Sequence, residues 1–277
     1  MRVMRRALAG ACLCVPIAAA AHGNVFSGDG AHAPIWASQA LFVIAWFGYA
    51  FGAARVRPTA ARRLIFHTMM LIAGLALFGP FDDWAGSSSA LHMVQHMLLM
   101  VVVAPLAVLA APLAQWRGLI GKSADAMWRP LLRLTRYPMV CAMLHAAAIW
   151  IWHAPAPYMA ALFNNGLHVL EHASFLFTGW LFWWSVLRPG RDTAIEGAMA
   201  LLFTLMHTGL LGALLTFAPE LLYSRESREL WDQQLAGLIM WVPGGFVYLG
   251  AAAWAGHRWL TGQPPGHPPR GAGWPAP

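Results

Sequence analysis

The sequence predicts an all-α integral membrane protein, built as a bundle of seven transmembrane helices that follows a cleavable signal peptide. Three observations support this prediction. The 277 residues are 59% hydrophobic and only 10% charged, whereas a soluble domain carries about 25% charged residues. Seven apolar segments are long enough to cross a bilayer. Basic residues gather in alternate loops between these segments, as they do in membrane proteins with a fixed orientation.

The first residues have the pattern of a secretory signal. Basic residues at the start are followed by an apolar run that ends at Ala21, and the alanines at 19–21 form a plausible cleavage site. Residues 1–21 are therefore predicted to be a signal peptide. Cleavage there would make His22 the new N-terminus, where a free amine beside an imidazole could chelate a metal such as copper or zinc. It would also leave Cys141 as the only cysteine, so we expect no internal disulfide.

The predicted transmembrane domain covers residues 34–256, and residues 257–277 form a Pro/Gly-rich tail. All its spans should be helices, because an open sheet edge cannot survive in lipid. Pro105 is expected to kink the third span, and Pro243-Gly244-Gly245 is expected to unwind the seventh locally. The seven spans are expected at 34–54, 64–80, 90–114, 137–153, 165–187, 195–218 and 233–256.

The basic residues set the expected orientation. They lie mainly after the first, third, fifth and seventh spans, at Arg55, Arg57, Arg62, Arg63, Arg117, Lys122, Arg129, Arg133, Arg136, Arg188, Arg191, Arg258 and Arg270. The positive-inside rule makes these loops cytoplasmic. We therefore expect a multi-pass protein of the plasma (inner) membrane, with its mature N-terminus outside and its C-terminus in the cytoplasm. Topology accounts for the net charge of +7, and without a basic face no nucleic-acid partner is expected.

Two histidine pairs are the strongest functional signal. His92 and His96 open the third span, and His168 and His172 open the fifth. A spacing of four places both imidazoles of a pair on one helix face. Ionisable groups at membrane depth are costly and usually functional, and both pairs fall near the outer surface. His153 closes the fourth span at the same level, so the five imidazoles predict one metal or haem site.

Imidazole suits copper, zinc, iron and nickel, and a thioether such as that of Met93 favours Cu(I). Glu171 lies within His168-x-x-Glu171-His172, which matches the inverted zinc-peptidase signature. The chain offers no catalytic domain outside the membrane to support that reading. Glu171 is better interpreted as a group that orients an imidazole, neutralises a bound cation or caps a helix start.

Two further histidines, His145 and His207, are expected near the middle of the membrane. They could be axial haem ligands on facing helices. They could equally form a second metal station or a proton relay, or simply a hydrogen bond between packed helices.

The motifs together resemble the CtaG family of caa-type cytochrome c oxidase assembly factors. The resemblance rests on His92-Met-Val-Gln-His96 before Ala104-Pro105-Leu106, on Trp152-His153-x-Pro155-x-x-Tyr158, on His168-x-x-Glu171-His172, and on Phe182-Trp183-Trp184. It covers about residues 34–256. It implies a polytopic plasma-membrane protein, not an enzyme, that is needed to mature a haem–copper oxidase. A cysteine-based copper transfer does not carry over, because Cys141 is alone in the bundle.

We therefore expect an assembly factor that binds copper, as Cu(I), near the outer membrane face and passes it by ligand exchange to an oxidase subunit. Two alternatives stay open at this point. A haem b-binding electron carrier would use histidines from different helices and would be red when purified. A membrane metallohydrolase would use His168, Glu171 and His172.

Overall fold

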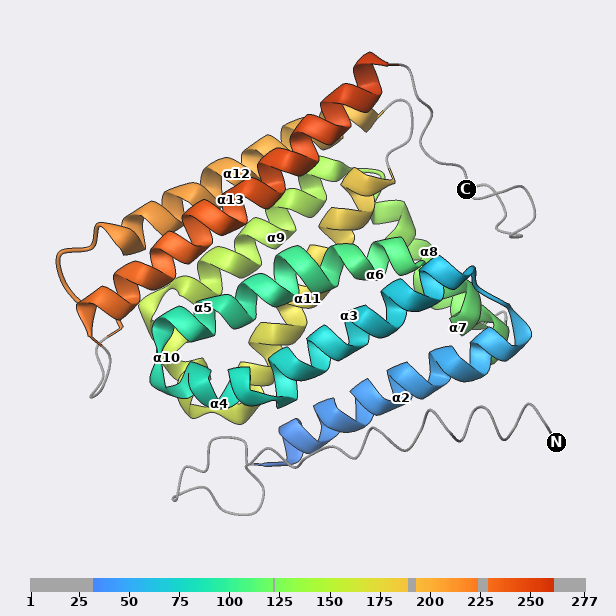
Figure 1. Ribbon diagram of the computed structural model, residues 1–277, viewed down its shortest axis with the longest axis horizontal. Coiled ribbons are helices and arrows are strands. Elements are labelled where there is room, and N and C mark those ends of the chain that lie inside the picture. Colours follow the sequence, from blue (N-terminus) through green and yellow to red (C-terminus); the bar gives the residue numbers. More distant parts are fainter. Residues whose placement is uncertain (1–31, 122, 189–192, 224–228, 262–277) are drawn as a thin grey trace.

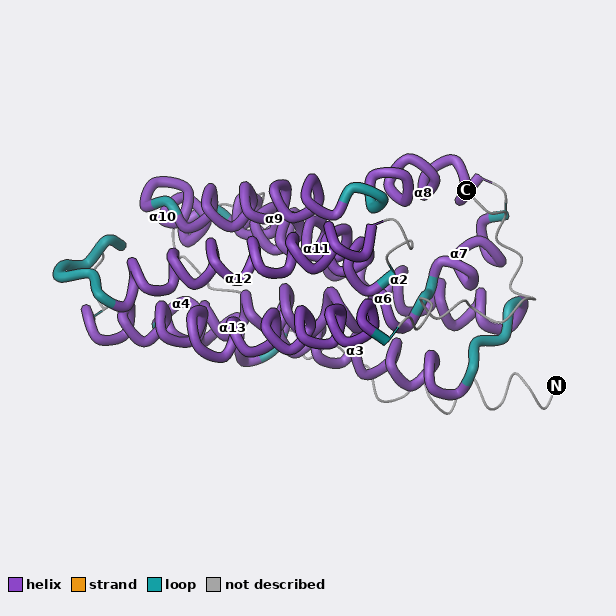
Figure 2. Tube along the Cα trace, turned by 90° about the horizontal axis from the view of Figure 1, so that it is seen from above, coloured by secondary structure: helices purple, strands orange, loops and turns teal. Residues whose placement is uncertain are grey.

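The structure is a computed structural model that describes residues 32–121, 123–188, 193–223 and 229–261. Within these ranges the regular secondary structure is entirely helical. The helices lie side by side in an elongated bundle (Figures 1 and 2). The expected signal peptide, His22 and the tail beyond residue 261 fall outside the described residues. The elements are α2 (Ala33–Arg55), α3 (Ala60–Phe78), α4 (Pro80–Ser87), α5 (Ser89–Met97), η2 (Leu98–Val103), α6 (Ala104–Ala110), α7 (Leu113–Ile120), α8 (Ser123–Leu134), α9 (Pro138–His153), α10 (Pro155–Phe163), α11 (Asn165–Leu187), α12 (Ala194–Thr216) and α13 (Leu230–Leu260).

Within the described residues, five helical stretches are long and apolar enough to cross a membrane. A sixth arises if the bent pair formed by α8 and α9 is one span, with an angle of 96° between its halves. The expectation of seven spans therefore stays a prediction. The seventh expected span corresponds to α11, which is 23 residues long. The polar side chains of His168, Glu171 and His172 lower the mean hydropathy of this helix. The five stretches are Ala33–Arg55, Ala60–Ser87, Ser89–Ala110, Ala194–Thr216 and Leu230–Leu260.

The helices are arranged so that α11 and the α5–η2–α6 stretch lie inside the bundle. In Figure 1, α12 and α13 form one edge and α2 forms the opposite edge. Helix α13 packs against α5, and α11 packs against α9, η2 and α6. Glycines bring α12 and α13 together, since a Cβ on Gly237 would lie 2.5 Å from the carbonyl oxygen of Gly212. Such close backbone approach between small residues is typical of membrane helix pairs.

Pro105 is accommodated by a widened turn. The six residues before Ala104 form the π-helical segment η2, and Pro105 then lies in the first turn of α6. A proline removes one helix donor, and a π-turn is a common response to such an interruption. The indole N–H of Trp183 donates to the carbonyl oxygen of Met100 at 2.8 Å, which satisfies one carbonyl of the widened segment and ties α11 to it.

The expected unwinding at Pro243-Gly244-Gly245 was wrong, because α13 is helical from Leu230 to Leu260. The glycines serve helix packing instead. A Cβ on Gly244 would lie 3.0 Å from the sulfur of Met97, so a bare glycine lets α5 approach α13 closely. The helix also extends past residue 257, where the tail was expected to begin.

Candidate metal centre

The start of α5 is fixed by contacts from a distant helix. Ser88 is its N-cap residue, and the hydroxyl of Ser88 donates to the Asp232 carboxylate at 2.6 Å. The backbone N–H of Ser89 also donates to Asp232. A carboxylate at these positions satisfies helix donors and complements the helix dipole. The first turn of α5 is thereby held against α13, and this sets where His92 and His96 lie.

We expect Asp232→Ala to loosen this end of the bundle. The change removes the acceptor for buried N–H groups at the start of α5, at a cost of about 1–2 kcal/mol in the free energy of unfolding. Thermal unfolding of the detergent-solubilised protein measures it. Asp83→Ala is a matched control, because Asp83 is exposed in the first turn of α4. Equal melting temperatures for the two variants would contradict the capping role.

Helix α11 begins beside α5 and presents the second histidine pair. Its N-cap is Asn164, whose side-chain oxygen accepts the N–H of Leu167 at 3.0 Å. The rings of His168 and His172 then lie one turn apart, with centroids separated by 4.3 Å. Both helix starts lie at the end of the bundle that also holds α4 and α10 (Figure 1). The two pairs therefore meet near one end of the molecule.

Four side chains converge into one group of donor atoms. One ligand atom each from His92, His168, Glu171 and His172 lies within 4.8 Å of the others. Donors around a tetrahedral ion with bonds of about 2.0 Å are roughly 3.3 Å apart, so small side-chain movements would close this group on an ion. His168 is half-buried and the other three side chains are buried. We call these four residues the donor group.

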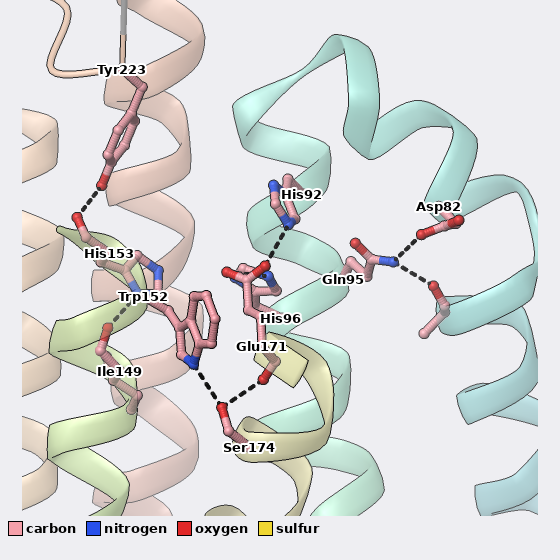
Figure 3. Close-up of polar contacts among 11 residues, drawn as sticks. Asp82, His92, Gln95, His96, Ile149, Trp152, His153, Glu171, Ser174 and Tyr223 are labelled. Carbon is pink, nitrogen blue, oxygen red and sulfur yellow. Dashed lines mark hydrogen bonds and ion pairs between the residues drawn. The ribbon is translucent and has the colours of Figure 1, made fainter. Parts of the chain in front are cut away.

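The carboxylate of Glu171 lies beside His92 and His96 (Figure 3), and we call the donor group together with His96 and His153 the cluster. One carboxylate oxygen is 3.6 Å from Nε2 of His96, and the other is 4.0 Å from Nε2 of His92. The side chain is 0% exposed, and neither oxygen accepts a hydrogen bond from any described residue. Burying a carboxylate in this way is costly unless a cation or a proton compensates it. An unsatisfied carboxylate facing imidazoles is the arrangement that a metal ion would complete.

His96 and His153 extend the cluster on the other side of Glu171. Their ring centroids are 5.7 Å apart, and that of His96 is 5.4 Å from that of His172. Nδ1 of His153 is 2.8 Å from the carbonyl oxygen of Ile149. Donation from Nδ1 to this carbonyl leaves Nε2 of His153 as a lone-pair donor. The five expected imidazoles thus lie together, but His96 and His153 stand outside the four-residue donor group.

The other expected residues lie elsewhere. Met93 is buried in the main hydrophobic core together with Met97 and Met100, and it is not part of the donor group. Nδ1 of His145 is 2.9 Å from the hydroxyl of Thr178. The ring of His145 stacks on Phe182. His207 contacts Phe203, so neither deeper histidine joins the cluster.

Two tyrosines pack against the histidines, a contact that was not predicted from the sequence. The ring of Tyr158 is 5.5 Å from that of His92 and stacks on Tyr223 at 3.9 Å. The hydroxyl of Tyr223 donates to the carbonyl oxygen of His153 at 2.8 Å. Burial raises the pKa of Tyr223, and Tyr158 and Glu171 raise it further, so this hydroxyl stays a donor. Tyr158 belongs to the motif quoted above, whereas no sequence signal marks Tyr223.

Gln95 is a second supporting residue that the sequence did not reveal. It is fully buried, and its side-chain amide donates to the carbonyl oxygen of Ala76 at 2.8 Å and to Asp82 at 3.1 Å (Figure 3). It lies between the two histidines of α5 in the sequence. Gln95 therefore fixes the rotation of α5 against α3 and α4, and with it the direction of both imidazoles.

A family model described as cytochrome c oxidase caa3 assembly factor matches residues 45–262. This range includes every residue of the cluster and both helix starts that position it. Searches of curated proteins and of solved structures found no match.

Proposed function

The chain belongs to the family of cytochrome c oxidase caa3 assembly factors, and we propose that it holds a copper ion for delivery to the oxidase during assembly. The ion would be bound by His92, His168, Glu171 and His172. Its transfer is a ligand exchange with an oxidase subunit and makes or breaks no covalent bond of the protein. The chain would thus act as a carrier and not as an enzyme.

The observation that carries this proposal is the convergence of three imidazoles and one carboxylate within 4.8 Å. A buried carboxylate without a hydrogen-bond donor is stable only with a proton or a bound cation, and imidazoles surround this one. Imidazole is a good ligand for copper and zinc. Haem–copper oxidases require copper, so the family favours copper over zinc here. The donor group contains no sulfur and therefore does not select Cu(I) over Cu(II).

The location of the cluster suits release to a partner at the outer surface. Arg55 ends α2, Arg62 lies near the start of α3, and Arg117 lies in α7. The end of α2, the start of α3 and helices α7 and α8 lie at the end of the bundle opposite α4 and α10 (Figure 1). By the positive-inside rule that end faces the cytoplasm. We therefore place the cluster at the periplasmic face. This orientation assumes that α9 and α11 both span the membrane, as in the expected arrangement of seven transmembrane helices.

Partial exposure of one donor favours transfer over storage. His168 is only half-buried, so one side of the group can be reached by an incoming ligand. An ion with such an entry path exchanges more readily than one enclosed on every side.

Metal analysis of the purified protein tests the proposal. The wild-type protein incubated with copper and freed of unbound ion should retain copper, and His92→Ala combined with His168→Ala should lose most of it. His257→Ala is the matched control, because His257 is an exposed histidine near the end of α13. The preparation should be colourless before loading, whereas a haem protein would show sharp visible bands. Copper-free wild-type protein, or retention by the double variant, would refute the assignment.

A further inference from the structure

Glu171 has imidazoles on both sides, and only one side belongs to the donor group. Its two carboxylate oxygens face different rings, since one lies 3.6 Å from His96 and the other 4.0 Å from His92. A carboxylate whose oxygens are directed at two separate sets of donors is the usual bridge between two metal ions. The second set consists of His96 and His153.

We propose that the cluster is a two-ion centre, in which Glu171 bridges the ion of the donor group and a second ion bound by His96 and His153. This inference rests on the proposed metal-binding function and extends it. The second ion would have three protein ligands and one open position.

The ring separations support a shared ion between His96 and His153. Two imidazoles that bind one tetrahedral ion through bonds of about 2.0 Å have centroids roughly 5 Å apart. The His96–His153 separation is 5.7 Å, comparable to the 5.6 Å between His92 and His168 of the donor group. By ring separation alone, the two pairs are similar.

The hydrogen bonds of His153 independently indicate a ligand. A metal-binding histidine usually donates its other ring N–H to a carbonyl or carboxylate, which fixes the tautomer. The 2.8 Å contact between Nδ1 of His153 and the carbonyl of Ile149 is of this kind. Nε2 is then a bare acceptor, yet it has no hydrogen-bond partner among the described residues and its side chain is 4% exposed.

His96 shows the same deficit. Neither of its ring nitrogens has a hydrogen-bond partner among the described residues, and the side chain is 1% exposed. Buried polar atoms are nearly always satisfied. His96, His153 and Glu171 each bury atoms without a hydrogen-bond partner among the described residues, and His96 contacts both of the others; a cation beside His96 would satisfy such atoms. A hydrophobic packing role would explain none of these atoms.

The test is the number of Cu(II) ions per chain in the full-length protein, measured by metal analysis, together with its electron paramagnetic resonance spectrum. We expect about two ions in the wild-type protein, coupled magnetically because bridged ions lie about 4 Å apart. His153→Leu should retain one ion, and its resonance should then account for all the copper. His145→Leu, which changes a buried histidine outside the cluster, should still bind two.

The possible outcomes separate this inference from the proposed function. One ion in the wild-type protein, with the number unchanged in His153→Leu, would refute the second position and leave the donor group standing. No copper in the wild-type protein would refute both. Because the wild-type count alone decides between one ion and two, the inference can be judged even if a variant fails to fold.

Discussion

Replacing Glu171 by Gln should abolish tight copper binding without loosening the fold. Gln has the same size, but it has no charge and carries only one acceptor oxygen. Losing a residue that merely supports a ligand lowers metal affinity about 10–100-fold, so losing a ligand that neutralises the ion should cost at least about 100-fold. Titration of the purified variant with copper, against a competing chelator, measures this change.

The same variant separates a binding role from a structural one. In the metal-free protein Glu171 is buried with no hydrogen-bond donor from the described residues. Removing a buried carboxylate of this kind relieves a cost instead of adding one. We therefore expect an equal or higher melting temperature for metal-free Glu171→Gln. A marked drop would mean that the carboxylate stabilises the fold.

The Glu171→Gln variant also discriminates between an assembly factor and a hydrolase. A metallohydrolase would use Glu171 as a general base, so the Gln variant would keep its metal and lose activity. In a copper carrier, the variant would lose copper binding and function together, because the carboxylate is itself a ligand. Unchanged copper affinity in Glu171→Gln, with oxidase assembly lost in cells, would favour the hydrolase.

Local spacing predicted much of the cluster, because helical periodicity acts within one segment. His92 with His96, and His168 with His172, were expected to share helix faces, and in each pair the rings lie 4.2 to 4.3 Å apart. That both pairs lie near one end follows from the position of each pair at the start of its span. The sequence did not predict which of the histidines belong to the donor group. Whether His92 or His96 joins the donor group depends on the rotation of α5, which its own sequence does not set.

The groups that set this rotation include partners outside α5. Asp232 holds the start of α5 across a separation of 143 residues. Gln95 had no assigned role, because its partner Asp82 lies on another helix. Periodicity identifies the buried face of a helix but not which neighbour that face meets. Supporting contacts of this kind therefore required the structure.

Replacing Gly237 by Ala should separate α12 from α13 and destabilise the whole bundle. The added Cβ would lie 2.5 Å from the carbonyl oxygen of Gly212 and 2.6 Å from the backbone nitrogen of Thr216. These are backbone atoms, which cannot rotate away as a flexible side chain would. Overpacking of this kind costs about 1–3 kcal/mol, and a lower melting temperature in detergent is the direct measure.

Gly250 on the same helix is the matched control, because a Cβ there meets no atom within 4 Å. Gly250→Ala should raise helix stability by up to about 1 kcal/mol through its higher propensity. Gly237→Ala should also retain less copper than Gly250→Ala. The reason is that α13 carries Asp232, which positions α5 and its histidines. If the Ala variants at positions 237 and 250 melt alike, the close glycine contact does not hold α12 and α13 together, and the support of the metal centre must be sought in α3 and α4.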